Sequence, residues 1–146
     1  MTDVISCFLK DEEGNILILK RSDKVLTYKG YWSGIAGYVE KDEKPIDTAY
    51  KEIREEVGLK DSDISLIKQG DIYSYTDIYE GKKYDWVIHP FLFDTSSKSK
   101  INIDWEHTEY RWILPQDIKK FDTVPHLEDI VRFLFGWGSC GGGEER

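Results

Sequence analysis

Three glutamates at helical spacing are the residues of this sequence best suited to chemistry. Glu52, Glu55 and Glu56 follow a glycine turn at Gly37. Residues three or four apart on a helix are neighbours, and like charges at that spacing repel by about 0.2–0.5 kcal/mol per pair. Such a cluster is unfavourable unless a positive charge lies among its members. The spacing therefore indicates a divalent-cation site, although the three glutamates alone would also fit a solvated acidic helix face.

The element that must position these glutamates is a helix, which we expect from Pro45 to about Val57. Proline is favoured in the first turn of a helix, and a glycine such as Gly58 is typical just beyond the last turn. At 100° per residue the glutamates occupy one arc, and the adjacent arc carries the apolar residues Ile46, Ala49, Tyr50, Ile53 and Val57. One stripe should pack against a core while the neighbouring stripe binds the ion.

Strands and a second helix are expected around this segment. Apolar and aromatic runs predict strands over 4–9, 16–19, 30–37, 64–79, 84–93 and 110–113, the first two joined by a turn-rich connection at 11–15. A brief helix should start at 114–117. Apolar residues at helical spacing predict a C-terminal helix that starts from Pro125 and ends before Gly136, followed by a mobile tail over 139–146.

Length and charge limit the classes of protein that fit. With 146 residues and 40% hydrophobic content, the chain suits one compact domain, expected over residues 1–138. The net charge of −8 disfavours broad binding of nucleic acid but suits a small phosphorylated substrate bridged by Mg²⁺. Without a long apolar run or a secretory signal, we expect no membrane association and a cytoplasmic location. Neither the cysteines, Cys7 and Cys140, nor His107 and His126 have partners at a zinc-like spacing.

The wider pattern around the glutamates resembles the sequence box of the Nudix hydrolases. That box reads Gly, five residues, Glu, seven residues, then Arg-Glu-apolar-any-Glu-Glu-any-Gly-apolar. This chain departs from it only at Lys51 and matches it with Gly37, Glu43, Glu52, Ile53, Glu55, Glu56, Gly58 and Leu59. The resemblance is to MutT-like pyrophosphohydrolases, and stretches 86–94 and 105–125 are similar to an archaeal branch of the family. It implies an α/β protein with the Nudix fold, an α/β/α sandwich around a mixed β-sheet.

The resemblance also implies roles for the box residues. The cofactor would be Mg²⁺, with Mn²⁺ as a substitute, because hard oxygen ligands suit these ions. Gly37 would let the loop turn tightly against the helix, and Glu43 would accept a salt bridge that steadies the loop. The metal ligands within this region would be the carboxylates of Glu52, Glu55 and Glu56 and the backbone carbonyl of Ala36.

A further carboxylate from outside the box is expected in such a site, where it binds a second metal ion or deprotonates water. Asp104, Glu106 and Glu109 cluster shortly before Trp112. Glu106 is the first choice as catalytic residue and metal ligand, and Glu109 is the second. Surface charge beside a buried Trp112 is the alternative interpretation of all three. Glu52 and Glu106 are both candidates for the general base.

Two basic residues complete the expected site. Lys51 stands where the family has Arg, and a flexible point charge orients carboxylates less strictly than a planar guanidinium does. We therefore expect activity to survive in reduced form, while an ion pair between Lys51 and Glu55 is the alternative role. Arg21 ends the second strand, where family members often place a cation that contacts substrate, although an exposed unpaired arginine would fit equally well.

The expected function is that of a Mg²⁺-dependent pyrophosphohydrolase. It would cleave a phosphoanhydride bond of a nucleoside diphosphate derivative through a metal-activated water. A Nudix-fold module that senses a nucleotide without cleaving it is one alternative, and an acidic solute-binding domain without phosphate chemistry is another. The expected partner is a small nucleotide ligand. Many relatives form dimers, so a homodimer is one expected assembly.

Overall fold

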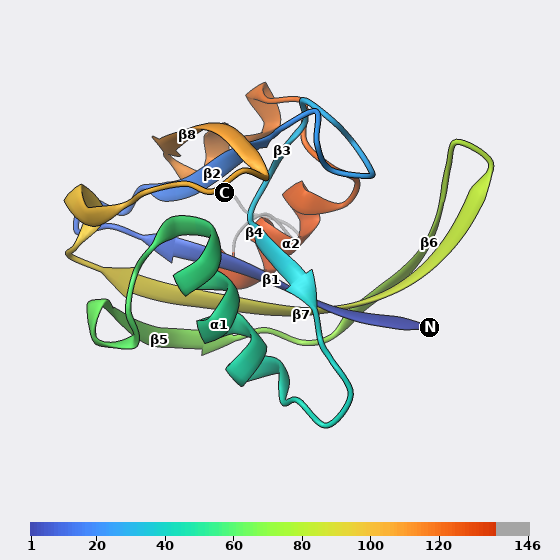
Figure 1. The fold of residues 1–146 in the computed structure, drawn as a ribbon. Coiled ribbons are helices and arrows are strands. Elements are labelled where there is room, and N and C mark those ends of the chain that lie inside the picture. Colours follow the sequence, from blue (N-terminus) through green and yellow to red (C-terminus); the bar gives the residue numbers. More distant parts are fainter. Residues whose placement is uncertain (137–146) are drawn as a thin grey trace.

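A mixed sheet of eight strands lies between two helical layers in the computed structural model, which describes residues 1–136 (Figure 1). The strands are β1 (Thr2–Lys10), β2 (Ile16–Arg21), β3 (Trp32–Ser33), β4 (Ile35–Tyr38), β5 (Ile64–Gln69), β6 (Tyr73–Tyr79), β7 (Lys82–Thr95) and β8 (His107–Ile113). The helices are α1 (Pro45–Val57) and α2 (Leu127–Phe135), with short 3₁₀ helices over Asp61–Asp63, Lys98–Lys100 and Pro115–Lys120. The tail predicted over 139–146 lies outside the described residues, as do Trp137 and Gly138.

The central strand β1 shows why helices cover both faces of the sheet. Successive side chains of a strand point to opposite faces. Ile5, Cys7 and Leu9 pack with α1 in one core, whereas Phe8 packs with α2 in a second core. The predicted α/β/α sandwich is therefore confirmed. We call the surface of the sheet that α1 covers the α1 face and the opposite surface the α2 face.

Both predicted α-helices are present, and each ends at a glycine. The prediction for α1 agrees at both ends, and Gly58 follows it with a left-handed φ of 77° that ordinary residues adopt reluctantly. The C-terminal helix starts slightly later than predicted and ends at Gly136, which has a φ of 69°. Within residues 1–136, the helices are too short or too polar to cross a membrane.

The segment predicted as one strand over 30–37 is two short strands, so that prediction was wrong. β3 pairs with β2, whereas β4 pairs with β1. The change of partner falls at Gly34, where a Cβ atom would lie 2.8 Å from the carbonyl oxygen of Cys7 and 3.0 Å from the Phe8 ring. Only glycine allows the chain to pass this close to β1, and the crossing places β4 beside α1, with Gly37 against Glu52.

The strand predicted over 64–79 is also divided, into β5 and β6, which both pair with β7. The break lies opposite Pro90, whose carbonyl oxygen accepts a bond of 2.9 Å from the Gly70 amide. The N–H and C=O of a strand residue point to the same side of the strand. Proline has no N–H, so β7 lacks a hydrogen-bond donor at Pro90 on the side that faces Gly70. Beyond the break, β6 and β7 continue as a long hairpin that projects from the body of the sheet (Figure 1).

The loop that leads into β8 is fastened to the C-terminal end of α1. The Asn102 amide donates to the Val57 carbonyl at 2.9 Å, and the Asp104 amide donates to the Glu56 carbonyl at 3.1 Å. These bonds satisfy carbonyl groups that the end of a helix leaves without intrahelical partners. They also bring residues 104–107 beside the box glutamates. β8 therefore begins at His107, earlier than predicted, and the brief helix expected near 114–117 is the 3₁₀ helix Pro115–Lys120.

Candidate active site

The three box glutamates differ in exposure although they share one stretch of α1. Glu55 is exposed, Glu52 is half-buried and Glu56 is buried, with 1% of its surface accessible. The helix turns Ile53 and Val57 into the core beside them. The arc adjacent to the apolar stripe therefore runs from solvent at Glu55 into the protein at Glu56.

Gly37 provides the space that the Glu52 side chain occupies. A Cβ atom on Gly37 would lie 2.6 Å from the Glu52 Oε2 atom and within 2.5 Å of its Cγ and Cδ atoms. Any larger residue at this position would push the carboxylate away. The role that the sequence suggested for Gly37, a close approach of loop and helix, has this contact as its physical basis.

Glu56 is a buried acid with little compensation for its charge. Its Oε2 atom has no hydrogen-bond partner among the described residues. Burial, hydrogen bonding with Glu52 and the negative charges of Glu106 and Asp104 raise the pKa of Glu56 well above its ordinary value. A buried polar atom without a partner is costly and is found where a site awaits a ligand. A cation placed among these oxygens would remove the cost.

Glu106 reaches this cluster from the loop before β8. Burial and the charges of Asp104 and Glu52 raise its pKa, and the positive charge of Arg21 opposes that rise. Burial likewise raises the pKa of Glu52, with the charge of Glu55 adding to it. Separate parts of the chain thus converge on one acidic cluster, whose elevated pKa values are typical of functional sites.

His107 belongs to the same cluster, although no spacing pattern in the sequence pointed to it. Its side chain is 2% exposed, its Nε2 atom lies 3.7 Å from Glu56 Oε1, and its Nδ1 atom lies 3.1 Å from Asp104 Oδ1. Burial lowers its pKa although Asp104 opposes this. One ligand atom each from Glu56, Glu106 and His107 can be chosen so that all three lie within 4.8 Å of one another. Glu56 and His107 are far apart along the chain, so a search for metal-ligand spacing among sequence neighbours does not find this pair.

Lys51 makes an ion pair with Glu43 at the start of α1. Its Nζ atom lies 3.0 Å from Glu43 Oε2, and Glu43 Oε1 also accepts from the Thr48 hydroxyl at 2.7 Å and the Glu40 amide at 3.1 Å. These bonds lower the pKa of Glu43 to about 2. Glu43 thus fastens the loop after β4 to α1.

Arg21 ends β2 and lies beside the acidic cluster. Its guanidinium Nε atom donates to the Thr27 carbonyl at 2.9 Å, and its second terminal nitrogen donates to the Thr27 hydroxyl at 3.2 Å. It also interacts electrostatically with Glu106 and Glu56. Arg21 is half-buried and bonded, so it is not the exposed unpaired residue of the alternative interpretation.

Glu109, the second candidate for the extra carboxylate, lies on the other side of the sheet. Its carboxylate lies 3.9 Å from Lys20 Nζ and 3.5 Å from Arg111 Nε. The guanidinium of Arg111 lies over the Trp32 ring, which belongs to the core of the α2 face. Glu106 and Glu109 therefore point to opposite faces. Ala36 lies on β4 directly before Gly37 and is half-buried.

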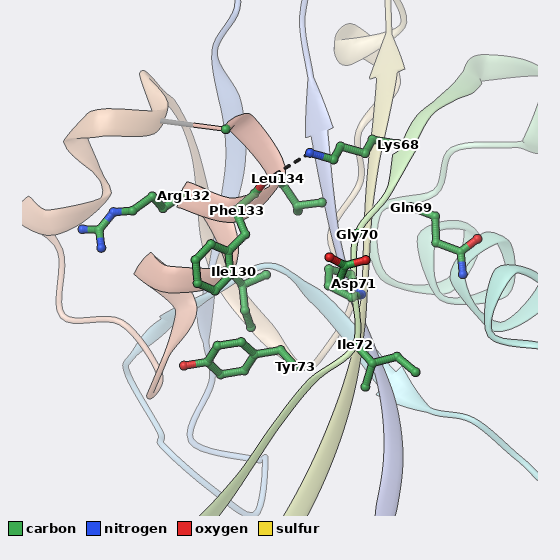
Figure 2. Close-up of a pocket in the computed structure, with 12 residues that line it drawn as sticks. Lys68, Gln69, Gly70, Asp71, Ile72, Tyr73, Ile130, Arg132, Phe133 and Leu134 are labelled. Carbon is green, nitrogen blue, oxygen red and sulfur yellow. Dashed lines mark hydrogen bonds between the residues drawn. The ribbon is translucent and has the colours of Figure 1, made fainter. Parts of the chain in front are cut away.

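A hollow of about 400 Å³ lies on the α2 face between α2 and the β5–β6 junction (Figure 2). Figure 2 shows Lys68 donating to the Phe133 carbonyl, a bond of 3.2 Å. The lining also includes Tyr73, Ile130 and Leu134. The sheet separates this hollow from the acidic cluster, so we do not include it in the candidate active site.

Comparison with known proteins agrees with the fold. A family model described as the NUDIX domain matches residues 2–134. The nucleoside triphosphatase NudI of Escherichia fergusonii is 28% identical over 125 residues, which cover 81% of this chain and 86% of that protein. The structure of the MutT protein from Methanosarcina mazei Go1 is similar with a TM-score of 0.68 and 25% identity, covering 92% of this chain and 94% of that one. The E. coli dihydroneopterin triphosphate pyrophosphohydrolase gives a TM-score of 0.76 at 17% identity, covering 92% and 96%.

A sandwich of this topology with clustered acids on α1 defines a class of phosphate-cleaving enzymes. The chain belongs to the Nudix hydrolase family, because the family model covers almost all of the described residues. It is a hydrolase that acts on phosphoanhydride bonds of nucleotide derivatives. The alternative of an acidic solute-binding domain, which required the box to be a coincidence, was wrong.

Proposed function

We propose that this chain is a divalent-cation-dependent pyrophosphohydrolase whose substrate is a nucleoside diphosphate linked to a further group. Nucleoside triphosphates fall in this class, and the relative from Escherichia fergusonii is named a nucleoside triphosphatase. The observation that carries the proposal is the buried carboxyl group of Glu56, which has an unpartnered oxygen and lies among other acids. A structural role alone would not explain so costly an arrangement.

The proposed role of each residue follows from its position in the cluster. Glu52, Glu56 and Glu106 would hold the cation, with Glu55 and the Ala36 carbonyl as further ligands at the exposed edge. A bound cation would neutralise phosphate charge and act as a Lewis acid. Gly37 would set the position of Glu52.

The chain's own residues would act on the substrate as follows. Arg21, already beside the acids, would contact a phosphate oxygen. Glu52 and Glu106 would be the two candidates to accept the proton of the attacking water. The water oxygen would bond to phosphorus as the bridging P–O bond breaks, and the bridging oxygen would leave with the second phosphate group. Lys51 and Glu43 would hold the loop that follows β4, the strand that carries Gly37.

A nucleotide panel with Mg²⁺ or Mn²⁺ tests the proposal. The panel covers ordinary and oxidised nucleoside triphosphates, nucleotide sugars, ADP-ribose and dinucleoside polyphosphates, with products resolved by chromatography. We expect Glu52→Gln to lower the rate about 10- to 100-fold, as loss of a metal-site residue commonly does. Glu109→Gln, on the opposite face of the sheet, is the matched control and should retain the rate. If no compound is cleaved but one binds, the nucleotide-sensing alternative replaces this proposal.

Domain extent is proposed on the sequence pattern, and assembly is proposed on the resemblance to the family. We propose that residues 1–138 act as one catalytic domain in the cytoplasm and that the chain forms a homodimer. A variant truncated after Gly138 should keep full activity, and sedimentation velocity should give twice the mass of one chain.

A further inference from the structure

The imidazole of His107 faces a carboxylate across a gap that is too long for a hydrogen bond. His107 Nε2 and Glu56 Oε1 are 3.7 Å apart, and both side chains are 2% exposed. Hydrogen bonds of this type are usually 2.7–3.2 Å long. Two polar atoms of buried side chains therefore face each other at a distance beyond that of a hydrogen bond.

Asp104 fixes which nitrogen of His107 is available. Its Oδ1 atom lies 3.1 Å from His107 Nδ1 and also accepts from the Glu106 amide at 3.2 Å. An ionised carboxylate can only accept, so the proton of a neutral imidazole belongs on Nδ1. The lone pair on Nε2 then points toward Glu56. This is the arrangement in which a carboxylate orients a histidine that binds metal through its other nitrogen.

The neighbouring oxygens complete a set of possible metal ligands, beside which Arg21 is a positive charge. Glu56 Oε2 is buried and has no partner in the described part of the chain. Ligand atoms of Glu56, Glu106 and His107 fall within 4.8 Å of one another. Two atoms that share one ion at about 2.1 Å each can be at most about 4.2 Å apart. The pair formed by Glu56 and His107 already meets this limit, and Glu106 needs only a small rotation.

We propose that His107 is a nitrogen ligand of the metal site, together with Glu56 and Glu106, and that the site consequently prefers a transition-metal cation such as Mn²⁺ over Mg²⁺. Imidazole is a ligand of first-row transition metals and suits Fe²⁺, Ni²⁺, Cu²⁺ and Zn²⁺ best, with Mn²⁺ the weakest binder of that series, whereas Mg²⁺ favours carboxylate, phosphate and water oxygens. The inference deepens the proposed function, since it rests on the same acidic cluster binding a divalent cation. It adds a donor that the box residues do not supply.

Electron spin-echo spectroscopy of bound Mn²⁺ tests the proposal directly. The probe is Mn²⁺ alone, added to untagged full-length protein so that no tag histidines contribute. A directly coordinated imidazole nitrogen modulates the echo with ¹⁴N frequencies. We expect these frequencies in the parent protein, and their replacement by the ¹⁵N pattern when histidine is ¹⁵N-labelled. This measurement needs no variant and so does not depend on a variant folding.

His107→Asn and His89→Gln form a matched pair of variants. Asparagine can keep the bond to Asp104 while removing the Nε2 position. We expect loss of the nitrogen modulation and at least about a tenfold weaker Kd for Mn²⁺, with a Kd for Mg²⁺ that changes less than about threefold. His89 is bonded to Asp3 at 2.8 Å through Nε2 and lies outside the cluster. His89→Gln should keep both the modulation and the affinity.

The outcomes separate this inference from the proposed function. Nitrogen modulation that disappears only in His107→Asn supports the inference. Mn²⁺ that binds without nitrogen modulation overturns it and leaves the metal-dependent hydrolase intact. Absence of Mn²⁺ binding to the parent protein, checked by calorimetry with a nonhydrolysable nucleotide present, overturns both.

Discussion

Asp11 and Glu56 are two buried carboxylates in opposite surroundings. Both are almost inaccessible, at 3% and 1% of their surface. Asp11 accepts bonds of 2.9 Å from the Glu13 and Asn15 amides and 2.8 Å from Lys98 Nζ. Although burial raises the pKa of Asp11, these bonds outweigh it and leave the pKa below its ordinary value. Glu56 has an unpartnered oxygen, and its pKa is raised.

The comparison teaches that burial alone does not distinguish a structural acid from a functional one. Asp11 closes the turn between β1 and β2, so its charge contributes to folding. The charge of Glu56 opposes folding, which fits the cation site that we propose for it. A buried acid is structural when the protein supplies its partners and functional when a ligand must supply them.

The largest expected effect is that of Glu56→Gln. Removing a ligand from the cluster should lower the rate about 100-fold. Without metal, the variant should melt at the same temperature as the parent or higher, because the amide removes an uncompensated buried charge. Steady-state kinetics measures the rate, and calorimetry in EDTA measures the melting temperature of the metal-free protein. A variant that is both inactive and much less stable would mean that Glu56 is structural.

Asp11→Asn should give the opposite result. The amide cannot replace all three accepted bonds, so we expect a loss of about 1–3 kcal/mol in the free energy of unfolding. The rate should stay close to that of the parent, since Asp11 lies at the turn after β1. Urea denaturation with an activity assay on the folded protein measures both. If Asp11→Asn lost activity but kept its stability, Asp11 would not be the structural acid of the pair.

Two glycine variants should separate an effect on the rate from an effect on stability. Gly37→Ala displaces the flexible Glu52 side chain, so the rate should fall about tenfold or more with little change in stability. Gly34→Ala instead meets the Cys7 carbonyl oxygen at 2.8 Å. It should cost about 1–3 kcal/mol of stability. Equal losses of stability in both variants would contradict the distinction.

The two acids should also respond oppositely to pH. Since the pKa of Glu56 is raised in the folded protein, folding of the metal-free chain should weaken as pH rises above the ordinary value of 4.5. Since the pKa of Asp11 is lowered, its contribution is present above 3.8 and disappears as pH falls below it. Melting temperatures across pH should show each slope vanish in Glu56→Gln and Asp11→Asn, respectively. A slope that survives its own variant belongs to another group.

Lys51→Arg should have the smallest effect. Lys51 and Glu43 already form a compensated pair, as Asp11 and Lys98 do. A planar guanidinium could hold Glu43 with two parallel bonds, so the rate should equal or exceed that of the parent. A rate well below the parent's would show that the arginine of the family box is not simply interchangeable in this surrounding.

Local patterns carried much of the prediction. Helix α1 runs between the predicted ends because Pro45 and Gly58 act on the backbone beside them. The box glutamates could be recognised since their spacing fits one helix face. Glu106 was preferred over Glu109, and the structure places it near Glu56, but the sequence offered no physical ground for expecting these two side chains on opposite faces of the sheet.

Contacts between segments that are distant along the chain could not be predicted from the sequence. The break at Gly34 depends on how closely β1 passes, and the break between β5 and β6 depends on Pro90 in another strand. His107 was set aside because its partner Glu56 is remote along the chain. Bonds from the loop before β8 to the end of α1 bring the two together.

The helix and its acidic face could be predicted from the amino-acid sequence alone, because both follow from spacing within a few residues. The three-dimensional fold was needed to show that Glu56 is the buried acid, which side chains surround it and which face of the sheet Glu109 points to. Burial and compensation depend on distances through space, and the chain order does not record them.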